Sequence, residues 1–264
     1  MTLSGKNFAI TRNEADATEF VKIVESEGGN AIPLPTLQLV ARSSKISIDC
    51  MDVYASYNPD YTVFMSSKAV RLLFNNAKKN NILDKMRLAV ANTTVVSVGP
   101  KTSIMLEDYK IKVNHMPESI FSSVGIGEIF SYMSRTKNKV LIPRSGASPP
   151  FLKDLLVKEG FDVHELYLYD VKPHPGGDVW KRFHTLLQNG KIHGMVFTSV
   201  SSVRAFFGII SGMSPSNLSP LLNNTTIVSI GPFTSEELNK FGVNHNVSTV
   251  HTVEGSLNEM RLHM

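Results

Sequence analysis

The chain carries the same fourteen-residue motif twice. TTVVSVGPKTSIML occupies residues 93–106 and TTIVSIGPFTSEEL occupies residues 225–238, with nine identical positions and two exchanges of Val for Ile. The two copies are 132 residues apart, which is half of the length of 264 residues. A repeat at this period predicts two copies of one structural unit.

Four more matches follow in the same order. FAITR from residue 8 matches VLIPR from residue 140, and EGGNAIPL from residue 27 matches EGFDVHEL from residue 159. VFMSSKAVRLLF from residue 63 matches VFTSVSSVRAFF from residue 196, and VNH recurs at residues 113 and 243. We infer a tandem duplication. The repeat itself leaves open whether each copy forms one contiguous domain or whether the copies exchange segments.

Each copy alternates short apolar runs with amphipathic stretches. Residues 8–11, 63–65 and 95–98 are typical of buried strands, whereas residues 15–27 and 68–78 have helical spacing. This alternation predicts parallel sheets covered by helices on both faces. Right-handed crossovers then place all strand-to-helix loops at one edge of each sheet.

These loops are rich in Ser and Thr, which favour the first positions of helices. In the two Gly-Pro copies, Gly99 and Gly231 are expected to take the positive φ of a sharp turn, and Pro100 and Pro232 to begin a helix. A hydroxyl at such a position caps a helix more often than it reacts. Nevertheless, this edge is where open α/β sheets bind ligands, and helix N-termini attract anions. Four basic residues lie in or beside the loops: Arg12, Lys68, Lys101 and Arg144.

Composition narrows the classes of function. The net charge is only +4 and the basic residues are dispersed, so no nucleic-acid stripe is expected. The single cysteine and the spacing of the eight histidines predict no metal site. No signal peptide or membrane span is visible, which favours a cytoplasmic location. P-loop, dinucleotide and G-x-S-x-G motifs do not occur. The residues alone therefore predict a two-domain α/β protein with an anion-binding cleft.

The motifs together resemble the uroporphyrinogen-III synthase family over nearly the whole chain. The resemblance rests on the order and spacing of ITR, IPLPTLQL, VFMSSKAVRLLF, VVSVGPKTSIML, LIPRSGASPPFLKDLL, EGFDVHELYLYDVKP, MVFTSVSSVRAFF and IVSIGPFTSEEL. It implies two flavodoxin-like, doubly wound parallel-sheet domains joined by a two-stranded linker. The implied segments are residues 1–34 plus 174–264, residues 41–165, and linker strands at 35–40 and 166–173.

The resemblance also implies a reaction. The family's substrate is hydroxymethylbilane, a linear tetrapyrrole with eight carboxylates. A hydro-lyase of this family removes the terminal hydroxyl as water, and closure through a spiro intermediate inverts ring D to give uroporphyrinogen III. The implied enzyme uses no cofactor or metal, acts as a cytoplasmic monomer, and makes transient contact with hydroxymethylbilane synthase. Neither a nucleic-acid nor a membrane partner is implied.

Site residues are implied by matching positions. Tyr169 matches the family's linker tyrosine and could donate a hydrogen bond to the leaving hydroxyl, unless Tyr167, two residues away on the same strand face, does so. Thr102 and Thr234 match hydroxyl positions on the two walls of the cleft, with capping as the competing role. Phe233 stands where some members have a further threonine. The expected substrate-binding residues are Arg12, Ser66, Ser67, Lys68, Lys101, Arg144, Ser145, Gly146, Thr198, Ser199 and Ser201.

Two other readings fit the same residues. A non-enzymatic two-domain protein could bind a small polyanion between its domains with the same loops. Another cofactor-free lyase or isomerase could use the same duplicated scaffold. Turnover of hydroxymethylbilane separates both readings from a synthase.

Overall fold

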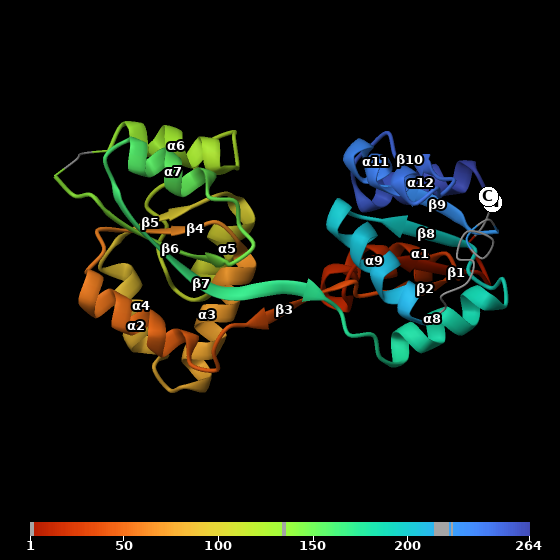
Figure 1. Ribbon diagram of the computed structural model, residues 1–264, viewed down its shortest axis with the longest axis horizontal. Helices are drawn as coiled ribbons and strands as arrows, with labels where there is room; N and C mark the ends of the chain where they lie inside the picture. Colours follow the sequence, from red (N-terminus) through yellow and green to blue (C-terminus); the bar gives the residue numbers. More distant parts are fainter. Residues whose placement is uncertain (1–2, 134–135, 214–221, 223) are drawn as a thin grey trace. The chain divides into compact units, whose positions relative to one another are not determined.

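The computed structural model describes residues 3–133, 136–213, 222 and 224–264. The chain folds into two compact units (Figure 1). We call Met1–Gln38 with Lys172–Met264 the discontinuous unit and Leu39–Val171 the contiguous unit. Each unit contains one five-stranded sheet covered by helices on both faces.

The sheet of the discontinuous unit is parallel and has the order β10-β9-β8-β1-β2. Strand β1, the first along the chain, therefore lies between β8, the central strand, and β2, an edge strand. Because β1 has neighbours on both sides, its last three residues, Phe8–Ile10, are apolar and buried, as expected for a strand inside a parallel sheet. The strands are β1 (Asn7–Ile10), β2 (Asn30–Pro33), β8 (Gly194–Phe197), β9 (Thr226–Ser229) and β10 (Asn246–Val247).

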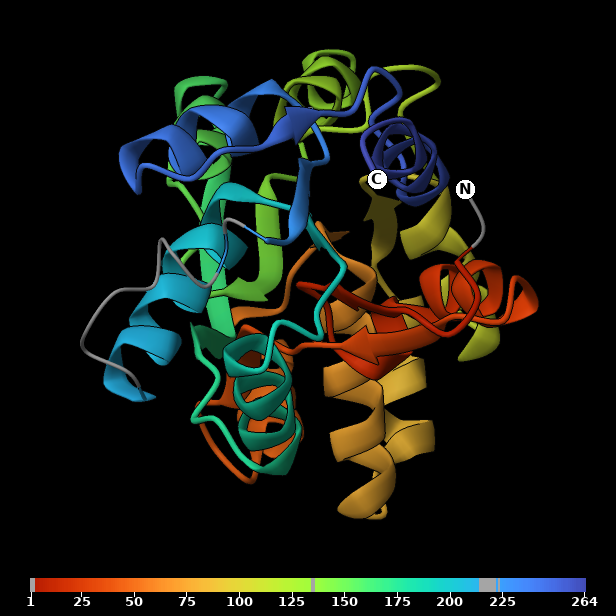
Figure 2. The same ribbon diagram turned by 90° about the vertical axis from the view of Figure 1, so that its right-hand side faces the viewer.

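Two hydrophobic layers enclose this sheet. Helices α8 (Asp178–Gln188), α9 (Val200–Met213) and α11 (Pro232–Lys240) cover one face. Helices α1 (Thr18–Ser26) and α12 (Val253–Leu262) cover the other face. A short 3₁₀ helix, η1 (Glu14–Asp16), precedes α1. Figure 2 shows α1, in red, and α12, in blue, in the same unit although they come from opposite ends of the chain.

The contiguous unit has the sheet order β3-β7-β6-β4-β5. Strands β7, β6, β4 and β5 are parallel, whereas β3 runs antiparallel to β7. The backbone N–H of Arg42 donates to the Leu168 carbonyl and that of His174 to the Thr36 carbonyl, so numbers rise on one strand as they fall on the other. The strands are β3 (Leu37–Ala41), β4 (Tyr61–Phe64), β5 (Thr94–Ser97), β6 (Lys139–Ser145) and β7 (Asp162–Pro173).

Helices again cover both faces of this sheet (Figure 1). One face carries α2 (Ile46–Tyr57), α3 (Ser67–Lys79), α4 (Leu83–Ala91) and α5 (Pro100–Asp108). The opposite face carries α6 (Ser123–Ser131) and α7 (Phe151–Lys158). In α3 the buried positions recur at three- and four-residue spacing, which places one apolar face against the sheet. The predicted doubly wound α/β architecture is confirmed.

The structure shows how the repeat is distributed. The first copy contributes β1 and β2 to the discontinuous unit but β4 and β5 to the contiguous unit. The second copy contributes β6 and β7 to the contiguous unit and β8 and β9 to the discontinuous unit. Each copy is therefore divided between both units. The chain changes unit inside β3 and β7, two paired strands that overlap the expected linker segments 35–40 and 166–173.

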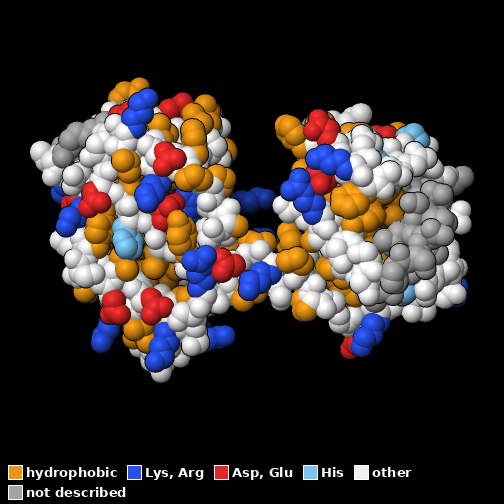
Figure 3. Space-filling model, viewed as in Figure 1, with side chains coloured by type: hydrophobic (Ala, Val, Ile, Leu, Met, Phe, Trp, Pro, Cys, Tyr) orange, Lys and Arg blue, Asp and Glu red, His pale blue; other side chains and the backbone are white. Residues whose placement is uncertain are grey.

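The visible surface carries charges of both signs. On the face seen in Figure 3, Lys and Arg side chains are interspersed with Asp and Glu on both units. Among the described helices, none has the length and apolar character required to cross a membrane.

Helices α6 and α12 lie close to the loops that precede them because each has a glycine in its first turn. A Cβ atom built on Gly125 would lie 2.0 Å from the carbonyl oxygen of Ile120. We expect Gly125→Ala to lower the free energy of unfolding by about 1–3 kcal/mol, since backbone atoms would have to move. Gly208→Ala in α9 is the control, because a Cβ there meets nothing within 4 Å. Urea unfolding of both variants tests this, and equal stabilities would contradict the tight approach.

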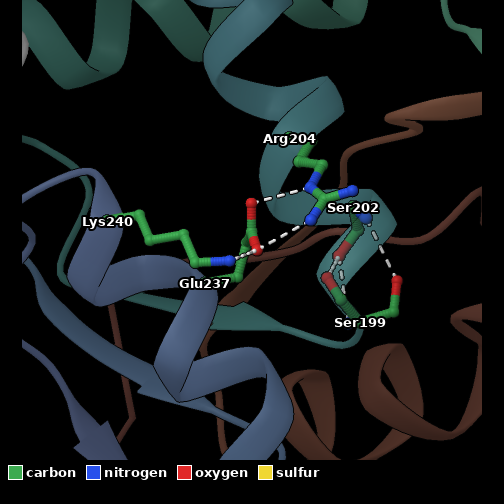
Figure 4. A network of polar contacts seen from close by, with 5 residues as sticks. All are labelled: Ser199, Ser202, Arg204, Glu237 and Lys240. Carbon is green, nitrogen blue, oxygen red and sulfur yellow. Dashed lines mark hydrogen bonds and ion pairs between the residues drawn. The ribbon is translucent and has the colours of Figure 1, made fainter.

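A charged cluster connects α9 to α11 in the discontinuous unit (Figure 4). Arg204 donates from Nε to Glu237 Oε1 at 2.7 Å, and Lys240 donates from Nζ to Oε2 at 2.9 Å. Hydrogen bonds from Arg204 and then Lys240 lower the pKa of Glu237 from 4.5 to about 2. The cluster thus stabilises the fold only while Glu237 is ionised.

The pH dependence of stability follows from the direction of that shift. Glu237 binds a proton more readily in the unfolded chain, so its contribution is complete above about pH 4.5 and disappears as the pH falls toward 2. We expect wild type to be more stable than Glu237→Gln at pH 7, with the difference shrinking below pH 4.5. Thermal unfolding from pH 7 to pH 2.5 measures this, and a difference that does not vary with pH would contradict it.

Candidate functional site

The expected site residues lie at the carboxyl ends of the parallel strands in each unit. Since parallel strands end at the same edge of their sheet, each set is brought to one edge. In the contiguous unit the ends of β4, β5 and β6, with the loops and first helical turns that follow them, supply Ser66, Ser67, Lys68, Lys101, Thr102, Ser145 and Gly146. In the discontinuous unit the loops and first helical turns after β1, β8 and β9 supply Arg12, Thr198, Ser199, Ser201 and Thr234.

Thr102 and Thr234 have the same environment in the two units. Each is the third residue of its helix, α5 or α11, and each is only 4% exposed. Gly99 and Gly231 occupy the N-cap positions, so the capping role considered for both threonines is wrong. Neither hydroxyl forms a hydrogen bond with any described residue. The two hydroxyl oxygens are not among the buried side-chain atoms that lack a partner, so solvent reaches them and both are accessible to a ligand.

The Gly-Pro turns differ from expectation in backbone geometry. Gly99 has φ 174° and Gly231 has φ −179°, which is extended backbone rather than the positive φ predicted from the sequence. Glycine is favoured there by close approach instead. A Cβ on Gly99 would lie 3.1 Å from Cβ of Phe121, and one on Gly231 would lie 3.3 Å from the ring of His251. Neither ring was identified from the sequence.

Serine and threonine side chains fix the loop after β8. Thr198 donates its backbone N–H to Thr11 Oγ1 at 3.0 Å and its hydroxyl to the Thr11 carbonyl at 3.2 Å. Ser199 accepts the Ser202 backbone N–H at 3.1 Å, while Ser202 Oγ donates to the Ser199 carbonyl at 2.7 Å (Figure 4). Thr198 and Ser199 therefore hold the loop, whereas Ser201 is exposed. Thr11 and Ser202 were missed, although both belong to the repeated motifs.

The equivalent loop after β4 has a simpler arrangement. Ser66 is the N-cap of α3, and its hydroxyl accepts the backbone N–H of Lys68 at 3.1 Å. Ser67 and Lys68 are half-buried in the first turn of this helix. The hydroxyl of Ser66 is thus used for capping, which leaves the first turn of α3 as the anion-attracting feature here.

Arg144 lies in a buried ion pair. Its NH1 group donates to Glu165 Oε1 at 2.7 Å, and the two side chains are 5% and 6% exposed. A second bond runs from NH2 to the Pro149 carbonyl at 3.2 Å, while Nε is buried with no partner among the described residues. Arg144 was expected to be a charge partner of the substrate. The structure instead neutralises it with Glu165, which the sequence did not reveal.

The remaining basic candidates are more accessible. Lys101 is exposed, and no described residue forms an ion pair with it. Arg12 is half-buried and donates from NH1 to the Asp16 carbonyl at 3.4 Å, a long contact that leaves most of its donors unused. Both groups can therefore reach an anion at their sheet edge. No cluster of His, Cys, Asp or Glu in the described parts of the chain is suited to a metal ion.

A β-bulge separates the two tyrosines of β7. Tyr167 pairs with Arg144 and Tyr169 pairs with Ser145, so Leu168 is the extra residue. Tyr169 is 5% exposed and packs in the hydrophobic layer of α2 to α5. Tyr167 is 38% exposed, and its hydroxyl donates to Glu165 Oε2 at 2.8 Å, which raises its pKa. The expectation that both tyrosines share a strand face is therefore wrong.

The bulge also ties Tyr169 to the loop after β6. Gly146 donates its N–H to the Tyr169 carbonyl at 2.8 Å, and Ser145 Oγ accepts the N–H of Ala147 at 3.2 Å. A Cβ on Gly146 would lie 2.2 Å from Arg42 NH2, because the bidentate pair of Arg42 and Asp170 lies over it. The Tyr169 hydroxyl itself forms no hydrogen bond with any described residue. Among the two tyrosines, the Tyr169 hydroxyl can therefore donate a hydrogen bond to a ligand, whereas that of Tyr167 already donates to Glu165.

The family comparison is consistent with this duplicated arrangement. The family model described as "Uroporphyrinogen-III synthase HemD" matches residues 18–258, which include both Gly-Pro turns and β7. The chain belongs to the uroporphyrinogen-III synthase family. This is a family of lyase-type cyclases that act on a tetrapyrrole.

Related proteins support the assignment over most of the chain. A putative uroporphyrinogen-III synthase of Methanocaldococcus jannaschii is 25% identical over 254 residues, covering 96% of this chain and 96% of the relative. The uroporphyrinogen-III synthase of Chlorobaculum parvum is 24% identical and covers 90% of each chain.

Solved structures show the same fold. The uroporphyrinogen-III synthetase of Helicobacter pylori has a TM-score of 0.64 at 17% identity, covering 98% of this chain and 100% of its own. A uroporphyrinogen III synthase of Thermus thermophilus has a TM-score of 0.58 at 17% identity, covering 98% of both chains.

We expect Arg144→Met to lower the free energy of unfolding by about 3–5 kcal/mol, because Glu165 is left buried without its counter-ion. Lys181→Met is the matched control, since its ion pair with Asp178 is exposed and contributes about 0–1 kcal/mol. The double variant Arg144→Met/Glu165→Leu should recover much of the loss. Urea unfolding measures all three, and an Arg144→Met variant as stable as Lys181→Met would contradict the burial of this charge.

Proposed function

We propose that this protein is a uroporphyrinogen-III synthase, a hydro-lyase that converts hydroxymethylbilane into uroporphyrinogen III with loss of water and inversion of ring D. Membership of the family carries the proposal. The equivalent positions of Thr102 and Thr234 support it further, because each hydroxyl is open to solvent at its sheet edge and has no partner among the described residues, so both can bind a ligand.

The proposed substrate suits the two sheet edges. Its eight carboxylates need many hydrogen-bond donors, and the helices that begin at Ser67, Pro100 and Pro232 offer free backbone N–H groups and the positive ends of their dipoles. The accessible Lys101 and Arg12 add charge without a dense basic patch. We propose that the sheet edge of each unit binds carboxylates of the substrate. Ser66, Thr198 and Ser199 contribute through the backbone that their hydroxyls hold, and Ser67, Lys68 and Ser201 through their side chains.

The chemical step needs little from the protein. Electrons from the pyrrole nitrogen expel the terminal hydroxyl, which leaves as water once it receives a proton. The resulting cation attacks the substituted carbon of ring D, and the spiro intermediate breaks and closes again with ring D inverted. We propose that the Tyr169 phenol donates a hydrogen bond to the departing hydroxyl. A positioned acid contributes about 10²–10⁴-fold to a rate.

Orientation is the larger contribution that we propose. Without control, the linear substrate closes directly to the unrearranged isomer. Closure is intramolecular with or without the protein, so the protein acts by selecting its geometry. Holding the chain so that only the substituted carbon of ring D is reached favours the rearranging attack, an orientation effect that can exceed the contribution of a positioned acid. Monomeric state, cytoplasmic location and transient contact with hydroxymethylbilane synthase stay predictions.

The test supplies freshly prepared hydroxymethylbilane to the purified protein, then oxidises the products and separates the porphyrin isomers. We expect isomer III with enzyme and isomer I without it, with no added metal or nucleotide. Isomer I alone in both samples would overturn the proposed activity.

We expect Tyr169→Phe to lower kcat at least several-fold without altering the fold, because only the phenolic hydroxyl is removed. Tyr167→Phe is the control two residues away, and it should leave kcat nearly unchanged because Tyr167 bonds to Glu165. Steady-state kinetics and thermal unfolding of both variants give the answer. Wild-type kcat in Tyr169→Phe would exclude Tyr169 from the reaction.

A further inference from the structure

Each Gly-Pro turn is flanked by one basic and one aromatic side chain, and the two exchange positions between the units. The second residue of α5 is Lys101, whereas the second residue of α11 is Phe233. The residue before the N-cap of α6 is Phe121, whereas the residue before the N-cap of α12 is His251. The contiguous unit thus has Lys101 with Phe121, and the discontinuous unit has His251 with Phe233.

Both rings next to the glycines are held in defined places. Phe121 approaches the N-cap glycine of α5, and His251 approaches that of α11, closely enough that a Cβ would touch either ring. The loops that carry these rings pack tightly against the helices that follow them. Gly125 in α6 and Gly255 in α12 allow this close approach, because they lie against the carbonyls of Ile120 and Val250. The rings are therefore presented by ordered backbone.

All four side chains are nevertheless exposed. Phe121 is 50% and Phe233 75% exposed, and Lys101 and His251 are also exposed. Exposed aromatic rings occur elsewhere in this chain, as at Tyr132 and Phe151, but Phe121 and Phe233 lie beside polar groups at a ligand-binding edge of the sheet, and binding sites combine apolar rings with a few polar groups. Within the described chain, neither Lys101 nor His251 forms a hydrogen bond or ion pair that would account for it.

The adjacent threonines indicate what kind of ligand belongs here. Thr102 and Thr234 are each only 4% exposed, but their hydroxyl oxygens are open to solvent and have no partner among the described residues. Because Cα–Cβ bonds of a helix tilt toward its N-terminus, these hydroxyls lie on the side of the first turn. A hydroxyl, free backbone N–H groups and a nearby base together suit a carboxylate, while the neighbouring aromatic ring suits a flat apolar ring.

We propose that each Gly-Pro turn is a subsite for one carboxylate-bearing pyrrole ring of the substrate. Phe121 and Phe233 contact the face of a pyrrole, and Lys101 and His251 bind its acidic arm together with the threonine hydroxyl. In the contiguous unit the base lies on the helix and the aromatic ring on the neighbouring loop, and in the discontinuous unit these places are exchanged. The two subsites therefore bind the pyrrole ring and its carboxylate in opposite orientations. That the ligand is a tetrapyrrole rests on the proposed function. That each turn binds one flat ring and one carboxylate rests on the side chains around the turns.

The exchange itself provides the test. We expect His251→Phe to raise the KM for hydroxymethylbilane about tenfold with little change in kcat, since the discontinuous unit then lacks a base at its turn. Adding Phe233→Lys recreates the arrangement of the contiguous unit and should restore most of the lost affinity. His263→Phe, a histidine at the other end of α12, is the control and should leave KM unchanged. Thermal unfolding of each variant confirms that it is folded.

A direct binding measurement separates this inference from the proposed activity. The probe is uroporphyrin, a flat aromatic octacarboxylate, followed by its fluorescence on titration with each variant. If wild type yields only isomer I, the subsites still stand provided that His251→Phe weakens uroporphyrin binding and the double variant restores it. If wild type yields isomer III but His251→Phe leaves both KM and Kd unchanged, the subsites are overturned and the activity stands. Failure of wild type to bind uroporphyrin, or no recovery in the double variant, also overturns them.

Discussion

Parallel strand pairing is the constraint on which the whole site depends. A parallel strand cannot return through a tight turn, so the chain must cross the sheet as a helix before the next strand begins. Every such crossover starts at the carboxyl end of a strand, and each sheet therefore collects its helix N-termini along one edge. Ser66, Gly99, Ser199 and Gly231 all stand at such starts. An anion-binding edge follows from the topology before any particular side chain is considered.

Duplication then supplies this edge twice, and small differences distinguish the copies. Thr102 and Thr234 are alike in position and burial, which shows that the repeat preserved the turn as a unit. Around them the copies have diverged, with Lys101 replaced by Phe233 and Phe121 by His251 at equivalent positions. A substrate built from four similar rings needs both qualities, since its rings share one chemistry but only ring D is inverted.

Much of the architecture could be predicted because it depends on local patterns. The repeat, the apolar runs and the Gly-Pro turns are written in short stretches of sequence, so the α/β class and the loops of the site were within reach. The errors concern contacts between distant residues. The ion pair of Arg144 with Glu165 joins adjacent strands, and the bulge at Leu168 depends on how β7 pairs with β6. Sequence periodicity does not reveal an extra residue in a strand. A regular two-residue period therefore predicts that the two tyrosines of β7 share one face, which the bulge prevents.

The turns illustrate a subtler limit. Glycine at 99 and 231 was correctly recognised as significant but was assigned to positive φ, whereas the backbone there is extended and the restriction comes from the rings of Phe121 and His251. Those rings lie about 20 residues further along the chain. A sequence shows that a side chain is missing, but only coordinates show which neighbour fills the space.

The division of each repeat between the two units has a consequence for the order in which the protein is made. Ribosomes release the amino terminus first, and β1 then waits for a partner that is encoded almost 190 residues later in β8. The contiguous unit is complete as soon as Val171 has emerged, so it can fold while the rest is still being translated. During that interval β1 can pair with β2 but lacks its second neighbour, so one edge of an apolar strand stays unpaired. A chain truncated after the contiguous unit would keep one folded half and expose the beginning of the other.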